Sequence, residues 1–323
     1  MRRLLDGLGH PERRYPAIHV VGTNGKSTAT RTIAALLSAD GRRAGAYTSP
    51  HVRGWAERIW VDGAEADFER AVARVRPQAE AVGATQFEAI TAAALVAFAE
   101  QRVDVAVVEA GLGGRLDATN VIDAEVVLLT NVSPDHTEVL GETPEQIAQE
   151  KLAVAHAARI VVLPDNRYEK LVPGSAKIVT GGARAAAEAF AGAQIEHDPE
   201  IDLPGRLDRR GRELWDGAHN PAGTAWLRAR LKEPYEVVVA SILADKDVDA
   251  MLSDLAAIVP TLIATQSTNP RALPAAELAA RARSHFARVE TEPDPVSALA
   301  RARESTDGDI LVTGSLYLLA DLS

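Results

Sequence analysis

The 323-residue sequence predicts an α/β fold in which helices cover a mainly parallel sheet. Three observations favour this class: short apolar strands alternate with Ala-rich stretches of helical period, 46% of the residues are hydrophobic, and only 4% are aromatic. Abundant alanine and scarce aromatic residues favour helices packed on a sheet over an all-β sandwich. The alternation itself is typical of βαβ units, whose strands run parallel.

The first half of the chain accounts for four strands and three helices. A short run that is apolar throughout predicts a buried strand, and apolar residues at every third or fourth position predict a helix. Gly41 ends the first helix, and Thr143 can cap the last one. The predicted elements are strand 17–21, helix 28–39, strand 44–47, helix 87–99, strand 103–109, strand 126–131 and helix 144–157.

A second α/β series predicts a second domain. Residues 157–201 show no sustained period and are predicted to be irregular. Pro204 and Gly205 then precede strand 235–242, helix 249–258, strand 262–265, helix 275–287 and strand 309–313. The length also exceeds one typical domain. We therefore predict two domains, 1–200 and 201–323, the second a smaller α/β domain of Rossmann-like type.

Composition excludes several classes of protein. The formal charge of −10, from 35 basic and 45 acidic residues, argues against nucleic acid or an anionic membrane as the main partner. Cysteine is absent, so disulfides, thiolate metal sites and cysteine nucleophiles are excluded. No apolar run approaches the ~20 residues of a membrane span, and the N-terminus lacks the apolar stretch of a signal peptide. We expect a cytoplasmic protein, and a monomer.

The strongest local signal is the segment GTNGKST at residues 22–28, between a predicted strand and a predicted helix. Its glycines let successive N–H groups face an anion, the helix N-terminus adds a favourable dipole, and Lys26 adds a cation. The strict Walker A spacing needs a glycine where this chain has Val20, so the match is to a shorter G-x-x-G-K-S form. We predict a P-loop that binds phosphate; the alternative is an ordinary turn.

Polar residues follow three further predicted strands: TSPH at 48–51, Glu109 with GLGGRLDATN at 111–120, and the pair Asp135 and His136. Ligands of an open parallel sheet bind beyond the carboxyl ends of its strands. A phosphate loop with acidic and imidazole groups at that edge suits Mg–ATP chemistry. Singly, Glu109 could be a surface ion-pair partner, His136 a helix cap, and the paired glycines a plain turn.

Nine segments form an ordered series: GTNGKST, YTSPH, TQFEAIT, VVEAGLGGRLDATN, NVSPDHTEVLGETPEQIAQEK, PGRLD, DGAHNPAG, DKD and VTGSLYL. The series resembles the motifs of the folylpolyglutamate synthase/dihydrofolate synthase family, part of the wider Mur ligase group. The resemblance implies an ATP-dependent ligase that joins L-glutamate to a carboxylate of folate or dihydropteroate. ATP would phosphorylate that carboxylate, and the amino group of glutamate would attack the acyl phosphate and displace phosphate.

The resemblance also implies the residues of the site. ATP would be bound by Asn24, Gly25, Lys26, Ser27, Arg206 and Asp216. Mg²⁺ would be bound by Ser49, Glu109 and His136, and a second Mg²⁺ by a carbamylated Lys151. The catalytic residues would be Lys26, Lys151 and His219. The pterin pocket would include Thr85, Gln86, Phe87, Glu88, Leu116, Asp117 and Ala118. By itself, Lys151 reads as an exposed helix lysine, and Phe87 as part of the core.

Departures from the family pattern leave the substrate open. Family members usually have a glycine after the lysine of the phosphate loop, where this chain has Ser27. Family chains are commonly longer. An N-terminal segment that helps bind pterin in the family is missing here, and so is part of the linker between Lys151 and Arg206. Another Mur-type amino-acid ligase and a non-catalytic ATP-binding paralogue remain alternatives. The motifs do not choose between dihydrofolate synthase, folylpolyglutamate synthase or both.

Overall fold

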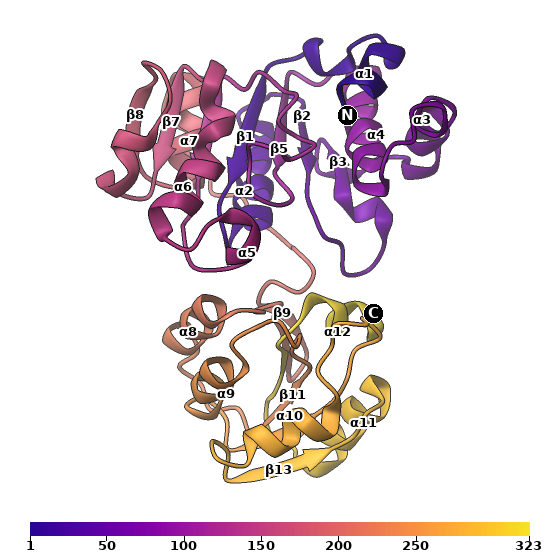
Figure 1. Ribbon diagram of the computed structural model, residues 1–323, viewed down its shortest axis with the longest axis vertical. Coiled ribbons are helices and arrows are strands. Elements are labelled where there is room, and N and C mark those ends of the chain that lie inside the picture. The colour runs from indigo at the N-terminus through magenta and orange to yellow at the C-terminus, as the bar shows by residue number, and fades with distance from the viewer. The chain divides into compact units, whose positions relative to one another are not determined.

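The structure is a computed structural model that describes residues 1–323. Its contacts divide the chain into two compact units (Figure 1). The first unit contains Met1–Pro50 and Gly54–Ile201, and the second contains His51–Arg53 and Asp202–Ser323. Each unit is an α/β structure built on one sheet, which confirms the predicted fold class.

The sheet of the first unit has eight strands in the order β4-β3-β2-β5-β1-β6-β7-β8. The six strands β2, β5, β1, β6, β7 and β8 are parallel to one another. At one side of the sheet, β3 is antiparallel to β2, and the edge strand β4 is antiparallel to β3. Their bounds are β1 Ala17–Val21, β2 Ala44–Tyr47, β3 Ile59–Val61, β4 Ala64–Glu65, β5 Val105–Glu109, β6 Val126–Leu129, β7 Ile160–Leu163 and β8 Lys177–Thr180. The central strands β1, β2, β5 and β6 are buried throughout, and for this reason they read as mostly apolar runs, with His19 inside β1 and Glu109 at the end of β5 as polar exceptions.

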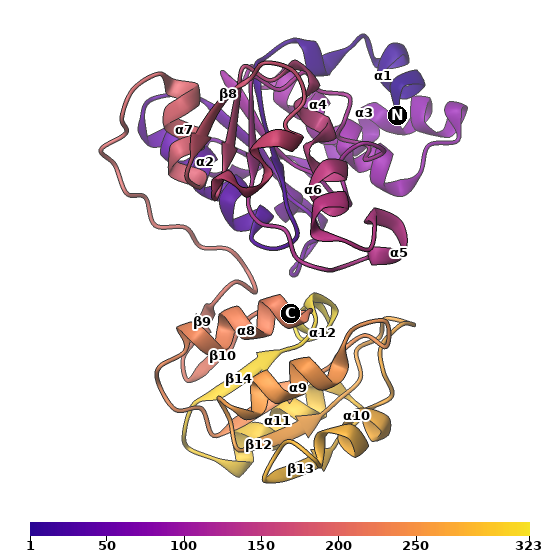
Figure 2. The same cartoon turned by 60° about the vertical axis from the view of Figure 1, so that its left-hand side comes forward.

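Helices cover both faces of this sheet. Apolar side chains of α1, α3 and α4 pack on one face at β2 and β5, and α6 continues that layer over β1 and β6. The other face is covered by α2 and α7, which lie side by side (Figure 2). The bounds are α1 Arg2–Leu8, α2 Lys26–Ala39, α3 Phe68–Val82, α4 Gln86–Glu100, α5 Thr137–Leu140, α6 Pro144–Leu152 and α7 Ala183–Ala191. The 3₁₀ turns are Pro11–Arg13, Trp55–Arg58, Ala153–Ala157 and Asn166–Leu171.

The approach of α4 to the sheet requires a glycine. A Cβ on Gly45 of β2 would lie 2.6 Å from the Cδ1 atom of Phe98, which is fully buried in α4. Only a residue without a side chain lets this helix pack so closely on the strand. The position of α4, and with it the segment TQFEAIT, therefore depends on Gly45.

The prediction that residues 157–201 are irregular is wrong. The segment contains β7, β8 and α7, and it completes one side of the first sheet. The strand β8 was missed because its end residues, Lys177 and Thr180, are polar and exposed, so it forms no apolar run. The helix α7 has only nine residues and directly follows two glycines, and sequence reasoning included it in the irregular segment.

The second unit has a six-stranded sheet in the order β13-β12-β11-β14-β10-β9. All neighbouring strands are parallel except β9 and β10. The strands are β9 Asp208–Arg210, β10 Glu213–Trp215, β11 Val237–Ala240, β12 Thr261–Ala264, β13 Arg288–Thr291 and β14 Ile310–Thr313. The helices are α8 Pro221–Arg230, α9 Val248–Ala256, α10 Ala275–Ala282, α11 Pro295–Ser305 and α12 Leu316–Asp321.

Both faces of the second sheet carry apolar cores, one including α9 and α10 and the other including α11 and α12. The predicted strands and helices of this unit are present with slightly different ends. Sequence reasoning missed β9, β10, β13, α8, α11 and α12, which are short or rich in charged residues. No helix in either unit is both long enough and apolar enough to span a membrane.

Candidate active site

The loop between β1 and α2 has the geometry that the segment GTNGKST predicts. Gly22 has φ 151°, and a Cβ at this position would lie 1.9 Å from Thr130 Oγ1. Gly25 has φ 76° and directly precedes α2. Both positions need glycine, one for lack of space and one for its left-handed backbone. The loop therefore directs the chain from a buried strand into a helix N-terminus, where backbone N–H groups can bind an anion.

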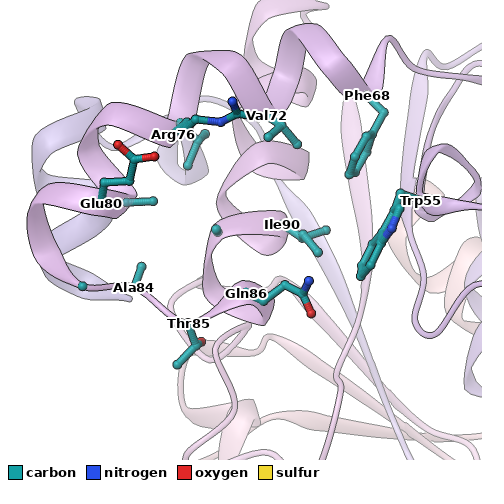
Figure 3. A pocket seen from close by; sticks show the side chains of 13 residues that line it. Trp55, Phe68, Val72, Arg76, Glu80, Ala84, Thr85, Gln86 and Ile90 are labelled. Atoms are coloured by element: carbon teal, nitrogen blue, oxygen red, sulfur yellow. The ribbon is translucent and has the colours of Figure 1, made fainter. Parts of the chain in front are cut away.

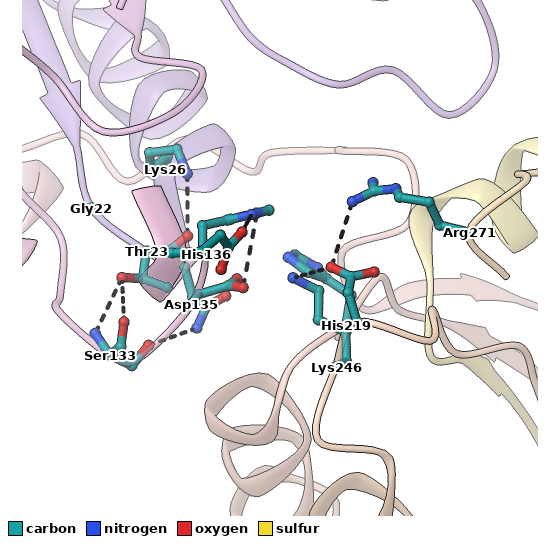
Figure 4. A network of polar contacts seen from close by, with 12 residues as sticks. Gly22, Thr23, Lys26, Ser133, Asp135, His136, His219, Lys246 and Arg271 are labelled. Atoms are coloured by element: carbon teal, nitrogen blue, oxygen red, sulfur yellow. Dashed lines mark hydrogen bonds and ion pairs between the residues drawn. The ribbon is translucent and has the colours of Figure 1, made fainter. Parts of the chain in front are cut away.

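Residues that follow β6 hold this loop in place. Asn131 accepts a hydrogen bond at Oδ1 from Asn24 N (2.9 Å) and donates one from Nδ2 to Asn24 O (3.0 Å). Thr130 Oγ1 also donates to Asn24 O, at 2.7 Å. Beside them, Thr23 Oγ1 accepts from Ser133 N and donates to Ser133 O, each at 3.1 Å (Figure 4). Sequence reasoning did not single out Thr130, Asn131 or Ser133, although two of the three begin the quoted segment NVSPDH.

Glu109 is the central acidic group of the site. It ends β5, and its side chain is almost fully buried. One carboxylate oxygen accepts a hydrogen bond from Ser27 Oγ (3.1 Å) and the other from Ser49 N (3.0 Å). These three residues come from the first turn of α2, the segment after β2 and the end of β5. The interpretation of Glu109 as a surface ion-pair partner is therefore wrong.

Two lysines lie at the phosphate loop. Lys26 donates to Thr23 O at 3.2 Å, and Lys151 of α6 donates to Gly22 O at 2.9 Å. Lys151 is 3% exposed, so the interpretation of this residue as an exposed helix lysine is wrong. Burial lowers the pKa of Lys151 to about 7, and the positive charge of Lys26 lowers it further in the same direction. Two cationic groups beside a turn of N–H donors make a region suited to phosphate.

His136 follows β6 and pairs with acidic neighbours. Its Nε2 lies 3.8 Å from Asp135 Oδ1, and its Nδ1 lies 3.8 Å from Glu138 Oε1 (Figure 4). His136 also precedes the short helix α5, but its side chain makes no capping hydrogen bond there, which argues against the capping interpretation.

A metal site made of protein side chains alone is not present. No group of three or more His, Asp or Glu side chains is arranged to hold a metal ion. The predicted set contains only two such residues, Glu109 and His136, and it needs further oxygen ligands. Ser27 and Ser49 lie at the Glu109 carboxylate. A carboxylate with hydroxyl, phosphate or water oxygens is the ligand set that Mg²⁺ prefers, so the residues present fit this ion.

The glycine-rich loop 111–120 is ordered by its own aspartate. Asp117 accepts at Oδ2 from Leu112 N (2.9 Å), and at Oδ1 from Thr119 N (2.9 Å) and Thr119 Oγ1 (2.5 Å). The loop also packs on the end of α6, where a Cβ on Gly114 would lie 2.6 Å from Lys151 O. Ala118 is half-buried, whereas Leu116 is 91% exposed.

The four residues of the predicted pterin segment 85–88 have different environments. Thr85 and Glu88 form a capping box at the start of α4. The half-buried ring of Phe87 lies 6.4 Å from that of Tyr47, and a Cβ on Gly111 would lie 2.5 Å from it. Gln86 and Thr85 instead line a pocket of about 380 Å³ between α3 and α4 (Figure 3).

Aromatic rings form one wall of this pocket, which we call the α3–α4 pocket. The rings of Trp55 and Phe68 are stacked, with centroids 6.4 Å apart and planes inclined by 20°. Ile90 and other apolar side chains lie deeper, and Arg76 and Glu80 add charge (Figure 3). A mostly apolar cavity with a few polar groups is typical of sites for small organic ligands.

In the second unit, the predicted residues gather around the loop after β10. Asp216 is buried, and its oxygens accept hydrogen bonds from Leu207 N (3.0 Å) and Ala218 N (2.9 Å). Burial raises the pKa of the Asp216 carboxyl. The Arg206 guanidinium donates to Gly205 O at 3.0 Å, and His219 Nδ1 donates to Gly217 O at 2.8 Å. Asp216 thus fixes the turn that carries His219.

Comparison with known proteins identifies the family. Residues 20–203 match the Mur ligase middle domain, and residues 205–316 match the Mur ligase glutamate ligase domain. The chain is 32% identical to the dihydrofolate synthase/folylpolyglutamate synthase of Mycobacterium tuberculosis, over 94% of this chain and 80% of that protein. The chain belongs to the folylpolyglutamate synthase/dihydrofolate synthase family of Mur ligases.

Solved structures of family members share the fold. M. tuberculosis folylpolyglutamate synthase complexed with ADP and AMPPCP has a TM-score of 0.92 and 31% identity, over 99% of this chain and 93% of that chain. Escherichia coli FolC in complex with DHPP and ADP has a TM-score of 0.87 and 25% identity, over 99% and 90%. The Yersinia pestis enzyme complexed with AMPPNP and Mn ion has a TM-score of 0.85 and 26% identity, over 99% and 91%.

The position of Glu109 predicts a change in metal dependence when its charge is removed. In Glu109→Gln we expect the Mg²⁺ concentration for half-maximal ATP turnover to rise about tenfold, with turnover reduced about a hundredfold. The glutamine keeps the size of the side chain, so thermal unfolding should stay close to that of the wild type.

The matched control is Glu145→Gln, which removes an exposed carboxylate from the first turn of α6. Its Mg²⁺ dependence should equal that of the wild type. An unchanged Mg²⁺ titration in Glu109→Gln would contradict a role of Glu109 in binding Mg²⁺.

Proposed function

We propose that this chain is an ATP-dependent ligase that adds L-glutamate to a folate-type carboxylate, in the manner of folylpolyglutamate synthase and dihydrofolate synthase. One observation carries the proposal: a glycine loop with two lysines lies beside a strand-end carboxylate, in a chain of this family. That combination supplies what a reaction between two anions needs, because a carboxylate must approach the γ-phosphate against charge repulsion.

The residues of the loop have separate tasks in this reaction. The N–H groups at the start of α2 and the ammonium group of Lys26 bind the phosphates and withdraw negative charge from them. Asn24, Gly25 and Ser27 complete the phosphate site in this proposal. Ser49, Glu109 and His136 would hold Mg²⁺, which would neutralise phosphate charge as the bond to the γ-phosphate breaks. An oxygen of the substrate carboxylate would attack the γ-phosphorus of ATP, which gives an acyl phosphate and releases ADP. The amino nitrogen of glutamate would then attack the acyl carbon, lose a proton and displace inorganic phosphate.

We propose that Lys151 holds a second Mg²⁺ after conversion to a carbamate. An uncharged amine adds CO₂ and loses a proton, which turns a cation into an anion that can bind a metal. The lowered pKa of Lys151, about 7, supports this step because much of the amine is then uncharged near neutral pH. Its place 2.9 Å from Gly22 O puts the group at the phosphate loop.

In the second unit, we propose that Arg206 and Asp216 contribute to ATP binding, and His219 to catalysis. The support is local. Arg206 lies next to Gly217, where a Cβ would be 2.7 Å from the guanidinium, and Asp216 accepts hydrogen bonds from two backbone amides, those of Leu207 and Ala218. Because Asp216 already accepts from Leu207 and Ala218, its contribution acts through the shape of this loop.

We call the folate-type substrate, whose carboxylate receives glutamate, the acceptor. We propose that its aromatic part binds in the α3–α4 pocket, with Thr85 and Gln86 beside it. The stacked rings of Trp55 and Phe68 offer a flat apolar wall, and the volume of about 380 Å³ lies in the range of small-molecule sites. Phe87, Glu88, Leu116, Asp117 and Ala118 remain proposed contacts of the same substrate. The substrates would thus be small molecules, and the cytoplasm, where ATP and glutamate are available, is the proposed location.

The proposal is tested by glutamate-dependent release of phosphate from ATP, with dihydropteroate and with tetrahydrofolate as acceptors. We expect activity with at least one of them. Release of phosphate that needs a different acceptor would favour another Mur-type ligase. ATP binding with no glutamate-dependent release under any condition would favour a non-catalytic paralogue.

In the same assay, we expect the rate of phosphate release to fall about a thousandfold in Lys26→Ala, because the variant lacks the ammonium group proposed to bind the phosphates. The matched control is Lys177→Ala on the exposed end of β8, which should keep the wild-type rate. Equal rates in the two variants would contradict the assigned role of Lys26.

Carbamylation predicts a specific NMR signal. With ¹³C-labelled CO₂ supplied, we expect a carbamate carbonyl resonance in the wild type that is absent in Lys151→Met and present in Lys177→Met. At a constant concentration of dissolved CO₂, the signal should grow from pH 6 to pH 8, because the uncharged fraction of an amine with pKa about 7 rises over that range. A resonance that persists in Lys151→Met would assign the modification to another group.

The acceptor pocket predicts a difference between two aromatic substitutions. In Trp55→Ala we expect the KM for the folate acceptor to rise about tenfold, with the KM for ATP within about twofold of the wild type. Phe87→Ala should have a smaller effect on the acceptor KM, because its ring already packs on Tyr47. The control is Trp226→Ala, a half-exposed ring in α8. A large effect in Phe87→Ala alone would place the acceptor elsewhere.

A further inference from the structure

A histidine lies in the middle of the first sheet, where an apolar residue would be expected. His19 is the third residue of β1, and its backbone pairs with Val108 of β5 and Val127 of β6. The side chain is completely buried. Burying a polar ring costs free energy unless it gains hydrogen bonds, so a histidine at this position requires a reason.

The hydrogen bonds of His19 lead to the glycine-rich loop. His19 Nε2 lies 2.8 Å from the hydroxyl oxygen of Thr119, which is also fully buried. The same hydroxyl lies 2.5 Å from Asp117 Oδ1. His19 Nδ1 has no hydrogen-bond partner. The ring is therefore held by one polar contact, and that contact belongs to the loop rather than to the sheet.

The direction of each hydrogen bond follows from chemistry. An ionised carboxylate can only accept, so the hydroxyl of Thr119 donates its hydrogen to Asp117. The hydroxyl oxygen must then accept from His19, which places the imidazole proton on Nε2. The opposite tautomer would bury an unpaired N–H at Nδ1. Burial lowers the pKa of His19 to about 4, so the neutral ring assumed here is the form present near pH 7.

Asp117 in turn holds the backbone of the loop 111–120 through its own hydrogen bonds. Its Oδ2 accepts from Leu112 N at 2.9 Å, and its Oδ1 also accepts from Thr119 N at 2.9 Å. We call the set His19, Thr119, Asp117 and Leu112 N the β1 relay. It connects the centre of the sheet with the first residues of the loop 111–120. The phosphate loop starts three residues after His19, but it is held separately, by Thr130 and Asn131.

We propose that His19 is a positioning residue for the acceptor: through Thr119 it sets the orientation of Asp117 and the shape of the loop 111–120. This inference rests on the proposed function, which assigns Asp117 and its neighbours to the acceptor. Loss of the Nε2 donor lets the Thr119 hydroxyl rotate, so that one of the three donors to Asp117 is no longer held in place. Acceptor binding weakens as a result, whereas the nucleotide site keeps its own hydrogen bonds.

The test replaces His19 with glutamine or with asparagine, whose side-chain nitrogens lie at different distances from the backbone. The side-chain nitrogen of glutamine can occupy the place of His19 Nε2, whereas that of asparagine reaches only the place of Nδ1. We expect His19→Gln to keep the acceptor KM within about threefold of the wild type, and His19→Asn to raise it about tenfold. The affinity for ADP, measured by calorimetry, should change by less than about twofold in both variants.

A second pair of variants guards against simple misfolding. Thr119→Ser keeps the hydroxyl, and Thr119→Val replaces it with a methyl group of similar size. We expect the serine variant to resemble the wild type and the valine variant to resemble His19→Asn. Equal effects of glutamine and asparagine, or equal losses of acceptor and ADP binding, would reduce His19 to a structural residue and overturn the proposal.

Hydrogen exchange separates failure of this inference from failure of the proposed function. The amide of Leu112 is bonded to Asp117, so its exchange should be slow in the wild type and in His19→Gln. We expect faster exchange in His19→Asn and in Thr119→Val, whatever substrate the enzyme uses. Unchanged Leu112 exchange in both of these variants overturns the relay even if the folate assay succeeds. A wild type inactive with both folates would overturn the acceptor assignment alone.

Discussion

β1 lies between β5 and β6, and this central place is the constraint on which the site depends. Because parallel strands end at the same edge, the end of β1 meets Glu109 of β5 and the residues that follow β6. The two segments are closely packed there, since Gly22 lies directly against the side chain of Thr130. A shift of β1 by one residue would move the phosphate loop away from both its neighbours and turn His19 out of its contact.

Charged side chains are concentrated at the carboxyl edge of the first sheet. Lys26 and Lys151 donate to neighbouring carbonyls of one loop, and burial first, then the positive charge of Lys26, lowers the pKa of Lys151. A polyphosphate anion would relieve the repulsion between the two lysines, so the charges at this edge favour the binding of a nucleotide. Glu109 adds the opposite charge next to the loop, held by Ser27 and Ser49 in a position that suits a divalent cation.

Much of this arrangement could be predicted from the sequence, because local patterns determine it. The glycines of GTNGKST predict the turn into α2, and apolar runs predict the four central strands of the first sheet. The prediction was wrong where the pattern is weak. β8 and α7 lie in a segment read as irregular, and Lys151 reads as exposed by itself although it is buried. Burial of a charged side chain depends on what packs over it, and no local pattern records that.

The sequence by itself determined the family, the α/β class and the position of the glycine loop 22–28, since each rests on residues that are close together in the chain. Only the tertiary structure decided which distant residues meet. It joined Asn131 to Asn24, Glu109 to Ser27 and Ser49, and His19 to Thr119. The physical reason is strand order: neighbours in a parallel sheet come from separate βαβ units, and the crossovers between them leave no local signal of their pairing.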